Sequence, residues 1–497
     1  MSPQAHYVDV AVRTPAGKGL TVYTYRVPDS LNLTIGHLVA VPFGSIVTQG
    51  IVVGCAGEPP PTEVRSILEL LDPQPVLRPA HVALAHWIAA QYGSSFFDAL
   101  QLALPPGVRQ RTVTWIGRVV DEVNPEDLSP RERLILDLLG PTRRDQLPHL
   151  RARLRQRGHV RGVTYALDRL ARFGIVRRYS ALAEPTVRPR RVTFVRALVA
   201  PDELRRLAAE RSRARGQASA LLALADLPDP TEPRPVTDLR RTRGLSRSVL
   251  TALARSGLVE LIEQEVRRDP LQPYATDDGP AIASPLTPPQ QAVYERLRQA
   301  LDQLLTRSGN EVGDAPPRPF LLHGVTSSGK TNVYLELLAT VAAQGGQGIV
   351  LVPEIALTPQ VVQRFVRRFP GRVAVLHSRL SPGEHYDEWR RIRAGEVDVV
   401  IGSRSALFAP LPALRLIVVD EEHEPSYKQE ASPRYHARDA AVRLGEIAGA
   451  LTVLGSATPD VTSYHRAVSG QWELLRLDER IAVLDPGTAA TGAPAVI

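Results

Sequence analysis

One short segment, Gly324–Thr331, constrains the fold of this chain more than any other part of its sequence. It fits the pattern G-x-x-x-x-G-K-[ST], it follows the apolar run Phe320–Leu322, and it precedes the helix-favouring stretch Asn332–Val341. In that context the backbone amides of the loop and of the helix N-terminus bind phosphate groups. A chance glycine-rich turn is the alternative, but it would lack this flanking strand and helix. The predicted nucleotide-binding residues are Gly324, Val325, Thr326, Ser327, Ser328, Gly329, Lys330 and Thr331.

From about residue 284 onward, apolar runs of strand length alternate with stretches of helical spacing. This alternation predicts an α/β fold in which a parallel sheet carries helices on both faces. The expected strands are Phe320–Leu322, Gly348–Val352, Val373–Leu376, Val397–Ile401, Leu414–Val419 and Leu451–Leu454.

Acidic residues end the predicted strand Leu414–Val419, about ninety residues after the phosphate loop. Asp420 would hold Mg²⁺ together with Thr331, and Lys330 would neutralise the β- and γ-phosphates of ATP. Glu421 would orient or deprotonate the attacking water. An acidic strand end alone is more often solvated surface, but here it follows a phosphate loop. The sequence therefore predicts an ATP and Mg²⁺ site whose catalytic residues are Lys330, Asp420 and Glu421.

A third segment, Gly455–Thr458, follows another apolar strand. The small hydroxyls of Ser456 and Thr458 suit a link between a nucleotide site and a DNA cleft. Such a segment means little alone. Together and in this order, the three segments resemble the motor lobe of a superfamily-2 helicase.

Further segments resemble, motif by motif, the PriA family of bacterial replication-restart helicases (primosomal protein N′). Leu286–Val293 resembles the adenine-recognising entry of that family, which implies that Gln290 contacts the base. Pro353–Gln360 and Ile401–Phe408 resemble motifs Ia and Ib, which border the single-stranded DNA path and here include Arg404. The resemblance implies a RecA-like P-loop motor lobe over residues 271–480.

The segment after the acidic strand end resembles the aromatic-rich loop that couples DNA binding to ATP hydrolysis in this family. Physically, Tyr427 and Tyr435 could stack on bases, and Lys428 and Arg434 could meet phosphates. An exposed basic loop is the alternative if the neighbouring motifs are ignored. The residues expected to couple the nucleotide and DNA sites are His423, Ser456 and Thr458.

The first 107 residues favour a small β-rich domain with short alternating strands followed by a helix. Val22–Pro28 resembles the part of the PriA domain that captures the 3′ end of a nascent strand. By position Tyr23, Thr24, Gly44 and Arg65 would form that pocket, with Tyr23 stacking on the terminal base. The family usually has Asp where Thr24 stands. Packing of Tyr23 within a sheet is the alternative.

Residues 108–270 are expected to form a winged-helix-like basic domain, because short helices with arginine-rich faces precede a strand at Val163–Tyr179 and again at Ser246–Ile262. Any small helical bundle would give a similar pattern. Residues 226–236 are rich in proline and are expected to form a linker. The net charge of +8 weakly favours a polyanionic partner.

Two rare residue types narrow the possible sites. Cys55 is the single cysteine, so the sequence predicts no intrachain disulfide and no cysteine-rich zinc site. The lysines are Lys18, Lys330 and Lys428, and two of the three fall within the motifs above. No segment resembles a signal peptide or reaches the ~20 apolar residues of a membrane span. We therefore expect a cytoplasmic, nucleoid-associated protein that does not contact membranes.

The resemblance implies a replication restart protein that recognises branched and single-stranded DNA. It further implies 3′-to-5′ helicase activity driven by ATP, and partners that include single-stranded-DNA-binding protein and the proteins that assemble the primosome and load the replicative helicase. The second motor lobe and paired-cysteine zinc region of the family have no counterpart, and residues 481–497 read as a disordered tail, so a truncation is expected. A fork-binding scaffold that does not unwind DNA is the alternative, and an unrelated P-loop protein is a third.

Overall fold

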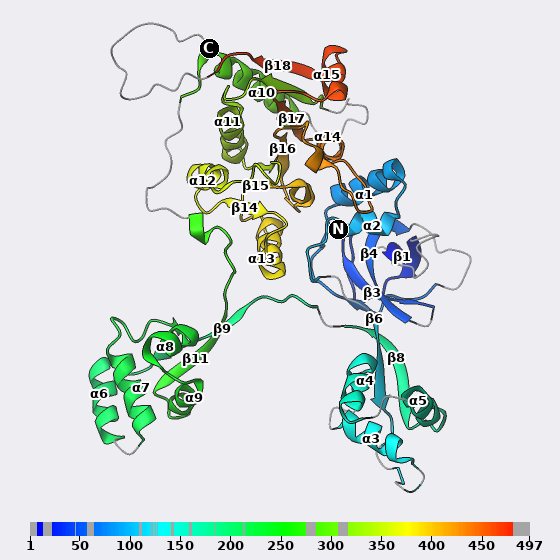
Figure 1. Cartoon of the computed structure of the whole chain (residues 1–497), viewed down its shortest axis with the longest axis vertical. Coiled ribbons are helices and arrows are strands. Elements are labelled where there is room, and N and C mark those ends of the chain that lie inside the picture. Colours follow the sequence, from blue (N-terminus) through cyan, green and yellow to red (C-terminus); the bar gives the residue numbers. More distant parts are fainter. Residues whose placement is uncertain are drawn as a thin grey trace. The chain divides into compact units, whose positions relative to one another are not determined.

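The computed structural model divides the chain into two compact units, unit 1 with residues 1–186 and 270–497, and unit 2 with residues 187–269 (Figure 1). It describes residues 7–12, 22–44, 46–56, 64–108, 112–120, 123–124, 126, 128–140, 144–158, 162–183, 185–211, 214–274, 285–306 and 317–480. The predicted tail at 481–497 lies outside these residues. No helix in the described ranges is both long and apolar enough to span a membrane.

The predicted motor lobe contains the expected parallel sheet, with seven strands in the order β14-β15-β13-β16-β17-β12-β18. The six expected strands are confirmed, and a seventh lies beside the strand that leads into the phosphate loop. The strands are β12 (Phe320–Gly324), β13 (Gln347–Leu351), β14 (Val373–Leu376), β15 (Val399–Gly402), β16 (Leu414–Val419), β17 (Leu451–Ser456) and β18 (Glu473–Leu477).

Both faces of this sheet are buried, which explains why its strands are almost continuously apolar. In β13, Ile349 and Leu351 belong to one hydrophobic cluster, while Val350 belongs to a second cluster on the opposite face. The second cluster includes residues of α10 (Pro288–Thr306), α11 (Lys330–Ala343) and α12 (Pro359–Arg368). The first includes residues of α13 (Pro382–Arg393), α14 (Ala437–Ala448) and α15 (Val461–Val468).

The N-terminal domain is a five-stranded antiparallel sheet in the order β2-β1-β4-β3-β5, followed by two helices. Its elements are β1 (Tyr7–Val12), β2 (Val22–Arg26), β3 (Leu38–Phe43), β4 (Ile46–Ala56), β5 (Glu69–Leu70), α1 (Pro79–Tyr92) and α2 (Phe96–Gln101). Residues of α1, such as Leu84 and Ile88, share one hydrophobic cluster with Leu444 of α14. Arg393 of α13 also forms an ion pair with Asp72 at 3.0 Å. The N-terminal domain and the motor lobe are therefore joined by a common core.

The middle of the chain differs from the expected single domain at 108–270, because it holds two three-stranded modules. The first module has the elements β6 (Thr112–Arg118), α3 (Pro130–Leu139), β7 (Arg144–Gln146), α4 (Leu147–Gln156), α5 (Val163–Arg172) and β8 (Val176–Leu182). The second module is unit 2, with β9 (Arg191–Ala197), α6 (Pro201–Glu210), α7 (Arg215–Ala225), β10 (Arg234–Pro235), α8 (Val236–Arg243), α9 (Arg247–Arg255) and β11 (Val259–Glu265). The expected linker at 226–236 lies inside this module, where β10 pairs with β9.

Candidate active site and DNA-contacting loops

The phosphate loop lies between the end of β12 and the start of α11, as the sequence predicts. Two of its residues, Ser327 and Gly329, have positive φ angles of 66° and 80°. That conformation is strained for a serine, and strain of this kind is concentrated at functional sites. The buried Lys330 donates a hydrogen bond from Nζ to the carbonyl oxygen of Gly324 at 2.9 Å. Its ammonium group is therefore held over the mouth of the loop.

Asp420 and Glu421 lie directly after β16 and next to this lysine. The Nζ atom of Lys330 is 3.8 Å from Oε1 of Glu421. The pKa of Asp420 is raised to about 6, mainly by burial and next by the negative charge of Glu421. The positive charge of Lys330 lowers this pKa and offsets part of the rise. The Oδ1 atom of Asp420 is buried without a hydrogen-bond partner among the described residues. An unpartnered carboxylate oxygen beside a phosphate loop fits a divalent cation.

Tyr334, which the sequence reading did not single out, lies behind these carboxylates on α11. Its side chain is buried, and both burial and the charge of Asp420 raise the pKa of its phenol. A Cβ atom placed on Gly455 would lie 1.7 Å from the Tyr334 hydroxyl oxygen. The phosphate-loop helix, the acidic strand end and the Gly455–Thr458 segment therefore meet at this ring. In the sequence, Tyr334 stands four residues after Lys330, about one helical turn along α11, and this spacing is the signal that could have identified it.

Gly455→Ala is expected to destabilise the motor lobe, because the added methyl group overlaps the Tyr334 hydroxyl. Overpacking of a buried site costs about 1–3 kcal/mol. The double variant Gly455→Ala/Tyr334→Phe removes that oxygen and should recover a large part of the loss. Thermal unfolding of the two variants checks this, and equal destabilisation in both would contradict it.

His423 and Ser456, two of the three predicted coupling residues, are brought together by the fold. Nδ1 of His423 lies 2.8 Å from Oγ of Ser456, and the backbone N–H of Thr458 donates to the same Oγ at 3.0 Å. His423 Nδ1 also lies 3.7 Å from Glu421 Oε2. A chain of polar contacts therefore runs from the predicted catalytic carboxylate to the Gly455–Thr458 segment.

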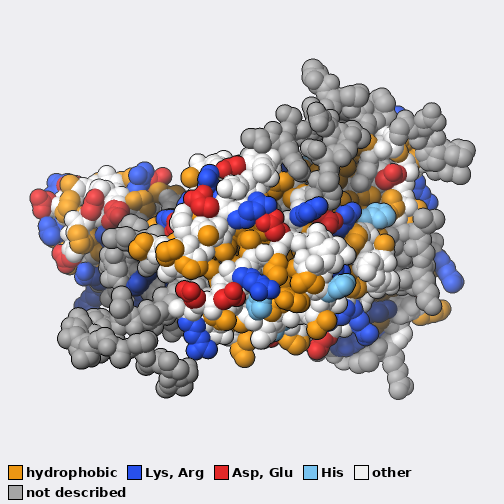
Figure 2. Space-filling model, turned by 90° about the horizontal axis from the view of Figure 1, so that it is seen from above, with side chains coloured by type: hydrophobic (Ala, Val, Ile, Leu, Met, Phe, Trp, Pro, Cys, Tyr) orange, Lys and Arg blue, Asp and Glu red, His pale blue; other side chains and the backbone are white. Residues whose placement is uncertain are grey.

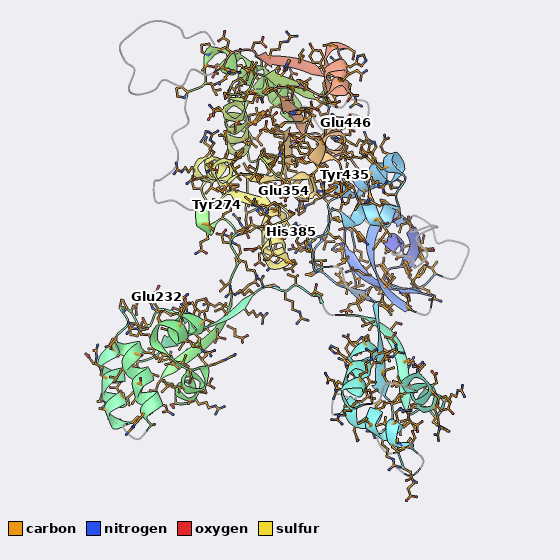
Figure 3. All side chains as sticks on the ribbon, in the orientation of Figure 1. Glu232, Tyr274, Glu354, His385, Tyr435 and Glu446 are labelled. Atoms are coloured by element: carbon orange, nitrogen blue, oxygen red, sulfur yellow. The ribbon has the colours of Figure 1, made fainter. Side chains whose placement is uncertain are left out.

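The aromatic-rich loop has a different arrangement from the one that base stacking requires. Tyr427 is 1% exposed and donates a hydrogen bond to the backbone oxygen of Asp420 at 2.6 Å. Tyr435, labelled in Figure 3 just before α14, is 2% exposed and packs edge-on against Phe408. In this conformation neither ring is available to stack on a base. The hydrogen bond of Tyr427 ties the loop to the predicted nucleotide site, and Tyr435 ties it to Phe408.

The basic side chains of the same loop also make intramolecular contacts. Lys428 donates to the backbone oxygen of Arg434 at 2.6 Å, and its Nζ lies 5.0 Å from the ring centroid of Tyr92 on α1. Arg434 donates from Nε to Glu430 O at 3.0 Å. Arg404 donates to the backbone oxygens of Ser426 and Lys428. The predicted contacts of these residues with phosphates stay predictions.

Gln290 is buried beside the phosphate loop. Its Nε2 donates to Ser328 O at 2.8 Å, and its Oε1 accepts from the backbone N–H of Thr287 at 3.1 Å. The side chain of Gln290 therefore supports the phosphate loop. Its predicted contact with adenine stays a prediction.

The N-terminal pocket residues are brought together only in part. Nη1 of Arg65 donates to Gly44 O at 2.6 Å. The ring of Tyr23 packs edge-on against that of Phe43, with the ring centroids 5.1 Å apart. Thr24 directly follows Tyr23 in β2, so its side chain points to the opposite face of the sheet, where it donates to Oδ1 of Asp9 at 2.7 Å. Thr24 is therefore separate from the other three, and the sequence reading missed Asp9 as its partner.

Comparisons with known proteins agree with this arrangement of domains. Residues 9–105 match the family model of the PriA 3′DNA-binding domain, and residues 287–467 match that of the DEAD/DEAH box helicases. A solved structure of RecG bound to a three-way DNA junction aligns with 41% of this chain and 25% of its own, at 22% identity and a TM-score of 0.30.

Relatives at higher identity cover nearly the whole chain. Replication restart protein PriA of Bacillus subtilis is 36% identical over 92% of this chain and 54% of its own length. PriA of Synechocystis is 37% identical over 92% of this chain and 52% of its own. The chain thus spans about half the length of these curated relatives. It belongs to the PriA replication restart family, with a segment that matches the PriA 3′DNA-binding domain followed by one that matches the DEAD/DEAH box helicases.

Proposed function

We propose that this chain acts in replication restart as an ATP-dependent DNA motor that recognises branched DNA with an accessible 3′ end. The observation that carries the proposal is the convergence of Lys330, Asp420 and Glu421 beside a strained phosphate loop. Lys330 and the neighbouring pair Asp420 and Glu421 come from two segments far apart in the sequence, and packing of the sheet alone does not require these charges to meet. Together they match the positive and negative charges that Mg²⁺-bound ATP requires.

The chain's own residues suggest how the site would act. Lys330 already points its ammonium group into the loop and would exchange the Gly324 carbonyl for phosphate oxygens. Thr331 and Asp420 would hold Mg²⁺, which supplies charge neutralisation on the phosphates. Glu421, with its φ angle of 46°, would orient the attacking water. Tyr427 would transmit changes in the aromatic-rich loop to the backbone of Asp420.

The N-terminal domain would contribute recognition of a DNA end. Tyr23, which packs against Phe43, offers a ring for stacking, and Arg65, which donates to Gly44 O, offers a guanidinium group for a phosphate. The common core with the motor lobe would keep a bound end in a constant relation to the nucleotide site. Unwinding in the 3′-to-5′ direction and cooperation with single-stranded-DNA-binding protein and helicase-loading proteins belong to the same proposal.

Steady-state ATP hydrolysis, measured with and without a fork that carries a free leading-strand 3′ end, tests the proposal. We expect turnover that the fork stimulates. Tight fork binding without turnover, in the presence of ATP and Mg²⁺, would contradict the motor and favour a fork-binding scaffold that does not unwind DNA.

Tyr23→Ala is expected to weaken binding of a recessed 3′ end by roughly five- to 150-fold, because stacking of one base on an aromatic ring contributes about 1–3 kcal/mol. The same substitution should change little in the binding of a DNA whose recessed 3′ end carries a phosphate. Fluorescence anisotropy with both DNAs checks this. Tyr7→Ala, on the neighbouring strand β1, is the matched control. Equal losses with the two DNAs would show that Tyr23 does not read the end.

A further inference from the structure

The two middle modules share one topology. In each, a long first strand lies between a short strand and the last strand, in the orders β7-β6-β8 and β10-β9-β11. In each, the first and last strands pair antiparallel over seven residues. The short strand continues directly into a helix, and a second helix then leads back to the last strand (Figure 1).

The sequence repeats at the same places. Residues 167–176 read LDRLARFGIV and residues 250–259 read LTALARSGLV, with six identical positions out of ten. Gly174 and Gly257 occupy the same place in the turn before the last strand, with φ angles of 69° and 71° that favour glycine. The second module therefore repeats the topology of the first and, among the described residues, has one additional helix.

In the second module, α8 and α9 form a helix-turn-helix. Leu239, Leu245, Leu250 and Leu253 are buried and hold the two helices against the module's core. Between Leu239 and Val259 the chain has five arginines and no acidic residue. Arg240, Arg243, Arg247 and Arg255 are exposed. The turn and the outer face of α9 therefore form a positively charged surface with small neighbouring side chains.

The corresponding helix of the first module has a different outer face. There Tyr165 is 72% exposed where the second module has Ser248, and Asp168 stands where the second has Thr251. Asp168 also binds Arg178 at 2.7 Å. A carboxylate repels a phosphate backbone, whereas Arg247, Ser248 and Thr251 on the face of α9 can all donate hydrogen bonds to phosphates.

We propose that the helix-turn-helix of the second module binds the phosphate backbone of duplex DNA, with Arg240, Arg243 and Arg247 as the phosphate contacts. The partner is chosen by charge: residues 187–269 carry a net charge of +6, and their helix-turn-helix contains only basic charges beyond Asp238. Figure 2 shows basic side chains dispersed among other types over one face of the molecule. This inference rests on the proposed function, because it assigns the duplex arm of a branched DNA to one module.

The test uses the full chain and a dumbbell duplex of about two helical turns, closed by loops at both ends so that it offers no 3′ end. The first variant is the triple substitution Arg240→Gln/Arg243→Gln/Arg247→Gln. Its control is Arg191→Gln/Arg206→Gln/Arg267→Gln, which removes the same charge from other parts of the module. Affinity is measured at several salt concentrations. The first variant should bind roughly tenfold or more weakly, and the slope of log affinity against log salt should fall by about 2–3.

Equal weakening by both triple variants, or an unchanged slope in the first, would overturn the proposal. Circular dichroism establishes that each variant is folded, and all six arginines are at the surface. Binding of ATP and of a single-stranded DNA with a free 3′ end, which has no duplex arm, should stay unchanged in both variants. Absence of ATP binding and of 3′-end binding in the wild-type chain would instead count against the proposed function, so the two failures are distinguishable.

Discussion

Lys330→Ala is expected to lower ATP affinity by about ten- to 150-fold, because a hydrogen bond to a charged group contributes about 1.5–3 kcal/mol. Hydrolysis should fall further, by on the order of 10²–10³, since the ammonium group also stabilises charge in the transition state. The Nζ atom donates to the Gly324 carbonyl oxygen at 2.9 Å, so the ammonium group already lies at the phosphate loop. Nucleotide titration and single-turnover hydrolysis measure the two effects separately.

The matched control for this change is Arg364→Ala, which removes one exposed positive charge from α12 of the same lobe. It should leave both quantities unchanged. Lys330→Arg should not restore activity, because a planar guanidinium group does not replace a compact ammonium group in a buried loop. Wild-type affinity in Lys330→Ala would remove the basis for the nucleotide site.

Arg438→Ala is expected to destabilise the motor lobe by about 3–5 kcal/mol, because it leaves a buried carboxylate without its counter-charge. That carboxylate is Glu422, which is 0% exposed. Its Oε2 accepts from Arg438 at 3.1 Å and from Ser463 at 2.8 Å, and its Oε1 accepts from the backbone N–H of Asp460 at 2.7 Å. Calorimetry should show the motor-lobe transition lowered by roughly 6–20 °C.

Arg443→Ala is the control, since this residue lies on the same helix and its ion pair with Glu446 is partly exposed. Such pairs contribute about 0–1 kcal/mol. Glu422→Gln/Arg438→Met should lose less than Arg438→Ala alone, because no buried charge then lacks a partner. If Arg443→Ala and Arg438→Ala cost the same, the buried pair has no special role.

Part of this molecule follows from the sequence by itself. The phosphate loop, the order of the parallel strands along the chain and the acidic strand end all depend on local backbone requirements that short patterns record. Apolar runs in β13 and β16 predict a sheet covered on both faces because each residue of a strand must be buried on one side or the other. The Lys330, Asp420 and Glu421 set follows from those same patterns.

Other features were decided only by the tertiary structure. Tyr427 and Tyr435 looked like exposed stacking residues, but their rings are buried by contacts with residues that are not adjacent in sequence. The direction of Thr24 depends on its pairing with β1, and the role of Glu422 depends on Arg438 approaching from α14. A polar or aromatic residue can serve a surface or a core equally well. Which one it serves is set by long-range packing, which a local pattern does not contain.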